Sequence, residues 1–137
     1  MLSLATRARN VAGDAIVDLI DGGTGGDMGY MEIRDGEKPS SPQVAAPGVL
    51  LSTLPMSNPA FGDFVNGRSQ ANDIASDTDI AENGIAGWFR VYDRDGLAVL
   101  DGTITVIGEG GDIEFESVNF IRGGTVILDG LEAIMPQ

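Results

Sequence analysis

Clusters of glycine divide this sequence into short apolar runs, and that division is its strongest constraint on the fold. The chain holds 20 glycines in 137 residues, about twice the usual share. Nine of them lie in clusters at Gly22-Gly23, Gly25-Gly26, residues 108–111 and Gly123-Gly124. Glycine clusters between apolar runs indicate turns that join short strands. Because 42% of the residues are hydrophobic, we expect one folded domain with its own core.

Residues 3–20 follow a different pattern, the spacing of an α-helix. We expect Ser3 to cap this helix and the Gly22-Gly23 pair to end it. Apolar residues recur in it at intervals of three and four and form one broad face, made of Leu4, Ala8, Val11, Ala12, Ala15, Ile16 and Leu19.

The charges of this predicted helix are placed against its dipole. Arg7 and Arg9 lie near its start, whereas Asp14, Asp18 and Asp21 lie near its end. Each opposes the dipole by a few tenths of a kcal/mol, up to about 1. Such a helix is marginal alone, so we expect it to be held either by the sheet of its own domain or by a neighbouring subunit.

The rest of the sequence is typical of strands. Apolar and polar residues alternate over residues 30–35, and Asn66-Gly67 and residues 93–96 predict tight turns. Further strands are expected over residues 49–54, 68–74, 84–92, 97–100, 103–107, 113–120 and 125–135, with a turn at Asp101-Gly102.

These elements define a fold class. We predict a mainly β protein, an antiparallel β-sandwich or small barrel preceded by one N-terminal α-helix. Residues 1–22 would form a helical arm, and residues 23–137 a single β-sandwich domain.

The composition also restricts the chemistry. The sequence has no histidine and no cysteine, and its only lysine is Lys38. Histidine and cysteine are the usual bases, nucleophiles and soft metal ligands, so their absence argues against Ser-His-Asp and Cys-His catalysis, zinc sites and disulfides. A net charge of −13 disfavours nucleic acid and anionic membranes as partners. We therefore predict no enzyme, no cofactor and no metal.

Acidic and glycine-rich segments offer weaker alternatives. Residues 93–96 begin like a calcium loop but lack the later glycine and glutamate, so a turn is favoured. Asp73, Asp77, Asp79 and Glu82 lie together in one loop, which is either a weak calcium site or simply solvated. Residues 22–26 have no following lysine and follow a helix, which disfavours a phosphate loop.

Surface contact is the function that the residues favour most. Phe61 and Phe64 lie in a loop with proline and glycine, and either form an exposed aromatic patch or pack in the core. The candidate interface residues are Leu4, Val11, Ile16, Phe61 and Phe64.

Several short segments spread along the chain carry a resemblance to known proteins. They are residues 4–10 (LATRARN), 21–26, 51–54 (LSTL), 58–62 (NPAFG), 87–91 (GWFRV), 93–96, 123–126 and 135–136. In these segments the chain resembles small virion structural proteins of tailed bacteriophages, most of all capsid decoration (cement) proteins. None of the segments is a catalytic motif.

The resemblance implies a protein made in the host cytoplasm and placed on the capsid exterior of the virion. There it would stabilise the head by binding the major capsid protein, and would bind itself as a homotrimer. A tail, baseplate or fibre component is the nearest alternative. The acidic loops and aromatic residues leave a third, a calcium-stabilised carbohydrate-binding module.

Overall fold

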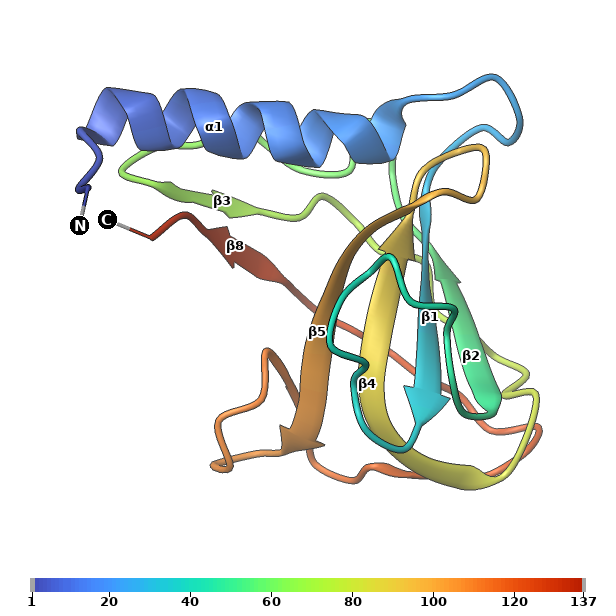
Figure 1. Ribbon diagram of the computed structural model, residues 1–137. Coiled ribbons are helices and arrows are strands. Elements are labelled where there is room, and N and C mark those ends of the chain that lie inside the picture. Colours follow the sequence, from blue (N-terminus) through green and yellow to red (C-terminus); the bar gives the residue numbers. More distant parts are fainter. Residues whose placement is uncertain (1, 137) are drawn as a thin grey trace.

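A computed structural model describes residues 2–136 of the protein (Figure 1). The fold is mainly β with a helix near the N-terminus, as the sequence predicts. The helix α1 (Thr6–Asp18) runs into a short 3₁₀ helix, η1 (Leu19–Asp21). The strands are β1 (Tyr30–Asp35), β2 (Leu50–Pro55), β3 (Arg68–Gln70), β4 (Gly84–Tyr92), β5 (Ala98–Val106), β6 (Ile113–Phe115), β7 (Asn119–Phe120) and β8 (Glu132–Ile134).

The main sheet curls into a half-barrel. Its strand order is β2-β1-β4-β5-β6, and β7 pairs with the start of β4. Every pairing in it is antiparallel except that of β5 with β6, which is parallel. A second sheet, β3 with β8, lies alongside α1 at one end of the half-barrel (Figure 1).

The core follows from the alternation along the strands. Met31 and Ile33 of β1 are fully buried, and Phe89 and Val91 of β4 pack beside them in the main core. The other face of β4 is buried too, because the loop before β2 covers it. There the Trp88 Nε1 donates a hydrogen bond to the backbone oxygen of Asp35 at 3.2 Å.

The expected turn at Asp101-Gly102 is wrong, because β5 continues through both residues. Gly102 faces Phe89 across the sheet, and a Cβ there would lie 2.2 Å from the ring. The Asp101 carboxylate accepts a hydrogen bond from the Arg90 Nε at 2.6 Å. Asp101 and Gly102 thus make contacts across the sheet, although an Asp-Gly pair is typical of a turn.

The two other predicted turns are confirmed. Asn66 and Gly67 both have positive φ, as a two-residue hairpin requires, and Val65 pairs with Arg68 across them. In the turn at residues 93–96, the Asp93 Oδ1 accepts hydrogen bonds from the backbone N–H groups of Asp95 and Leu97.

Several element ends differ from prediction. The helix begins at Thr6 with Ala5 as its N-cap, so Ser3 does not cap it. The returning strand over residues 68–74 is limited to β3, and the long last strand over residues 125–135 is limited to β8. Before β8, Val126 makes only a single bridge to Asp77.

Candidate functional site

The helix packs on its own domain with its less apolar face. The buried residues on this side of α1 and η1 are Arg9, Gly13, Val17 and Ile20. The backbone at Gly13 lies so close to the Phe64 ring that a Cβ there would be 2.5 Å from the ring atoms. Of the two supports that the sequence left open, the structure shows the chain's own domain.

Three side chains of this helix side hold the loop that precedes β3. The Asn10 Oδ1 accepts a hydrogen bond from the Gly67 N–H, and the Asp14 Oδ1 accepts one from the Phe64 N–H, both at 2.8 Å. The Asp21 Oδ1 accepts one from the Ala60 N–H at the same distance. Burial raises the pKa of Asp21 above its ordinary value. The hydrogen bond from Ala60 lowers this pKa in part, and the nearby charge of Asp18 raises it further. Two of the carboxylates that oppose the dipole therefore have a structural use.

Arg9 ties the start of the helix to the end of the chain. Its Nε and Nη2 donate to the backbone oxygen of Met135 at 3.0 and 2.7 Å. The guanidinium also fills the space beside Gly67, where a Cβ would collide with it. Arg9, although its charge opposes the helix dipole, therefore makes a structural contact 126 positions away in sequence.

The apolar face of the helix is left on the surface. Val11 is 69% exposed and Leu19 60% exposed, and the sequence-predicted contact residues Leu4 and Ile16 are also exposed. Between them, Ala5, Ala8, Ala12 and Ala15 line a shallow hollow together with Arg7 and Val11. This face, called here the α1 stripe, consists of Leu4, Ala8, Val11, Ala12, Ala15, Ile16 and Leu19.

The two phenylalanines of the interface prediction lie elsewhere. Phe61 is 6% exposed and Phe64 5% exposed, and both belong to the hydrophobic core. The idea of an exposed aromatic patch is wrong, because α1 covers the loop and presses on Phe64. The alternative interpretation, core packing, is the one that the structure shows.

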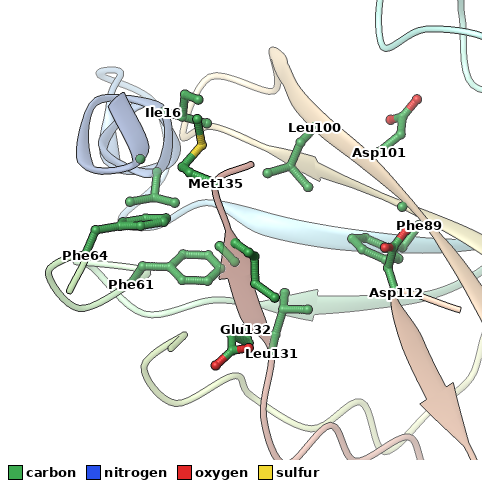
Figure 2. Close-up of a pocket in the computed structure, with 15 residues that line it drawn as sticks. Ile16, Phe61, Phe64, Phe89, Leu100, Asp101, Asp112, Leu131, Glu132 and Met135 are labelled. Atoms are coloured by element: carbon green, nitrogen blue, oxygen red, sulfur yellow. The ribbon is translucent and has the colours of Figure 1, made fainter. Parts of the chain in front are cut away.

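An apolar cavity lies where the half-barrel stays open, between β5 and β8. Its volume is about 260 Å³. Figure 2 shows its side chains pointing toward one another from the helix, from β5 and from the segment around β8. The lining includes Ile16, Phe61, Phe64, Leu100, Leu131 and Met135, and Asp112 lies at its border. The Glu132 carboxylate is bound by the Arg68 and Gln70 side chains of β3.

Beside this cavity, residues 99–101 of β5 and the edge of β8 opposite β3 have no strand partner within residues 2–136. The Thr103 N–H donates a hydrogen bond to the Asp112 side chain, which shows that it points away from β4. Backbone groups two residues apart on a strand point to the same side, so those of Asp101 also point away from β4. On β8, Leu131 and Met135 bond toward β3, so Glu132 and Ile134 present their N–H and C=O groups to the other side. The gap between residues 99–101 and β8 is called here the β5/β8 seam.

On the face of the sheet opposite the cavity, β4 and β5 are joined by a buried ion pair. Arg90 and Asp101 have side chains only 4% and 3% exposed, and the guanidinium donates to both carboxylate oxygens. Arg90 also donates to the backbone oxygen of Val44 and lies over the Trp88 ring. The hydrogen bonds to Asp101 raise the pKa of Arg90 despite its burial. This edge of the seam is therefore rigidly held.

The acidic and glycine-rich segments have internal partners. Asp77 accepts a hydrogen bond from the Ser52 hydroxyl at 2.6 Å, and the Asp95 carboxylate accepts two from the N–H groups of Thr24 and Gly25. Within residues 2–136 there is no group of three or more acidic or other ligand residues placed to hold a metal ion. Nor does that part of the chain contain a helix long and apolar enough to cross a bilayer.

Comparison of the chain with protein-family models, with curated proteins and with solved structures found no match. The candidate site therefore rests on this chain's own geometry.

Sequence reasoning found the α1 stripe but missed the seam. The alternation of Leu131, Ala133 and Met135 with Glu132 and Ile134 is a strand signal that marks one edge of the seam. Nothing local in the sequence indicates that the edge of β8 opposite β3 lacks a partner.

Proposed function

We propose that this protein is a non-catalytic virion structural protein, a capsid decoration protein that stabilises the head by binding major capsid subunits. The observation that carries the proposal is the β5/β8 seam. We infer that an extended segment of the capsid subunit lies in the seam as an added strand, in the position that a closed barrel would fill.

The physical basis is strand addition. The unpaired backbone groups of Asp101, Glu132 and Ile134 would supply main-chain hydrogen bonds, and the apolar cavity beneath would receive alternate side chains of the added segment. Covering the edges would also remove the exposed strand pairing sites that soluble proteins otherwise protect.

Charge indicates the kind of segment that fits. The protein carries a net charge of −13, and Asp112 lies at the border of the seam. An extended segment with alternating apolar residues and basic flanks therefore fits best. Many modest contacts of this kind, repeated over a symmetric shell, would give firm attachment.

The test uses heads from phage particles that lack this gene. Purified protein is added back, and its position and copy number are measured in a density map of the particle. We expect binding on the outside of the head at on the order of hundreds of copies, as repeated attachment requires. Density on the tail, or no binding to heads, would contradict the proposal.

A proline at Ile134 examines the seam itself. The Ile134 N–H faces the open edge and has no partner within residues 2–136, so Ile134→Pro removes a donor needed only by an added strand. We expect this variant to fold and to lose head binding. The matched variant Ile134→Ala keeps the N–H and should bind. Equal binding by both variants would exclude strand addition at β8.

A further inference from the structure

We propose that the α1 stripe is a self-association surface, on which α1 of a second copy packs antiparallel about a two-fold axis. This inference goes beyond the proposed function, because the α1 stripe meets the cavity of the seam only at Ile16 and is otherwise a different surface. It rests on two features of α1: the order of its exposed apolar residues and the position of its two unused charges.

The order of apolar residues is nearly the same from either end. From the N-terminal side it is Leu4, Ala8, Val11, and from the C-terminal side, apart from Ile16, which also lines the cavity, it is Leu19, Ala15, Ala12. A two-fold axis between Val11 and Ala12 would therefore place alanine against alanine and leucine near leucine. The small residues in the middle allow a close helix approach, at about the 8 Å lower limit of helix packing.

The charges favour the same arrangement. The side chains of Asn10, Asp14, Asp21 and Arg9 are used by contacts within the chain, whereas those of Arg7 and Asp18 make no ion pair or hydrogen bond within residues 2–136. Arg7 and Asp18 are 11 positions apart, which is three turns and about 20°, so they lie on the same flank of the stripe.

A two-fold axis perpendicular to the helices brings the same flanks of both helices together. Arg7 of each copy then faces the region of Asp18 of the other, so the contact is complementary twice. The partner's dipole is also reversed, so charges that oppose their own helix dipole favour the neighbouring helix. A parallel pair would instead carry the Arg7–Asp18 flanks of the two copies to opposite sides of the contact, so these charges would not meet. The surface is thus complementary to a second copy of itself.

Sedimentation equilibrium on the purified full-length protein tests this, at low salt and between micromolar and millimolar concentration. We expect a monomer–dimer equilibrium that reaches twice the 14.3 kDa chain mass. Val11→Glu should abolish it, while Ile107→Glu, an equally exposed apolar residue on a distant loop, should leave it unchanged.

Charge reversal identifies the pairing. We expect Arg7→Glu and Asp18→Arg each to weaken self-association about tenfold, since both symmetric contacts become repulsive. Neither should lower the folding stability, because each change improves the helix dipole interaction. The double variant, and an equimolar mixture of the two single variants, should both recover association, because each again places opposite charges together.

Three results would overturn the inference. A wild-type protein that stays monomeric at all concentrations would assign the stripe to a different partner. A trimer, which the resemblance to decoration proteins implies, would exclude the two-fold pair. A dimer whose strength is unchanged by Val11→Glu, or that is not recovered in the mixture of single variants, would place the contact elsewhere.

Discussion

Arg90 and Asp101 show how a single pair of charges fixes the centre of the sheet. Their side chains are almost fully buried, and the guanidinium is further held by Val44 and by the Trp88 ring. Removing one charge from such a pair leaves the other without compensation in a poorly solvated place. The pair therefore contributes to a unique arrangement of β4, β5 and the covering loop.

We predict that Asp101→Asn destabilises the protein by about 3–5 kcal/mol, the cost of an unpaired buried charge. Urea unfolding followed by Trp88 fluorescence measures this, since Trp88 is the only tryptophan and lies against Arg90. Arg68→Gln is the control, because the Arg68–Glu132 pair is exposed and should contribute less than about 1 kcal/mol. Equal losses in the two variants would contradict the assigned role of burial.

Asp21 provides a prediction about pH. Its pKa in the folded state is above the ordinary 3.8, chiefly because of burial, so the folded state holds this proton more firmly than the unfolded state. The resulting stability is present below pH 3.8 and is lost as the pH rises through the raised pKa.

We expect Asp21→Asn to stabilise the protein at neutral pH, because asparagine keeps an oxygen for the Ala60 N–H but carries no charge. The gain should shrink toward zero below pH 3.8, when the wild-type carboxyl is protonated. Urea midpoints across this pH range measure the difference, with exposed Asp63→Asn as control. A gain that does not change with pH would contradict the explanation.

At the scale of elements, sequence predicted α1 but not the side on which it packs. Hydrophobic periodicity assumes that the apolar face is buried. Here the opposite side is buried. Its Asn10, Asp14 and Asp21 side chains each accept a hydrogen bond from a backbone N–H group of the loop before β3. Such a match depends on a loop distant in sequence, so local pattern reasoning does not find it.

The strands, too, were predicted only in part from sequence. Local alternation and turn residues predicted β1, β4 and the turn between β4 and β5. The turn at Asp101-Gly102 failed because cross-strand contacts with Arg90 and Phe89 override local composition. The seam was missed for a related reason: whether the edge of a strand is paired is decided by topology, and not by the strand's own residues.

Gly13 gives an element-scale prediction in which two effects oppose each other. In an isolated helix Gly13→Ala would stabilise by about 1 kcal/mol. In this protein the new methyl group would lie 2.5 Å from the Phe64 ring, and such overpacking costs about 1–3 kcal/mol. We therefore expect a net loss in urea unfolding. In a Phe64→Ala background the ring is gone, so the same change should be stabilising; a loss there too would contradict this account.

At the scale of the whole molecule, helix and sheets share one core. Val17 and Ile20 of the helical segment belong to the same buried cluster as Met31, Leu54 and Phe61. Arg9 meanwhile holds Met135, so the two ends of the described chain are joined. The sequence predicts an arm over residues 1–22 and a separate domain over residues 23–137. Whether these two parts unfold together or independently tests that prediction.

Removal of residues 1–22 answers it. Losing the burial of Val17 and Ile20 alone removes about 3–6 kcal/mol, at about 1.5–3 kcal/mol for each side chain. Because folded domains are stable by only about 5–15 kcal/mol, we expect the truncated protein to be partly or wholly unfolded at room temperature. Near-ultraviolet circular dichroism and Trp88 fluorescence measure this, with removal of residues 1–4 as the control, which should keep the native midpoint because Leu2 and Leu4 are exposed. A truncation of residues 1–22 that retains the full-length urea midpoint would instead show that the helix is an independent arm, and that its contacts with Phe64 and Met135 contribute little to the stability of the sheets.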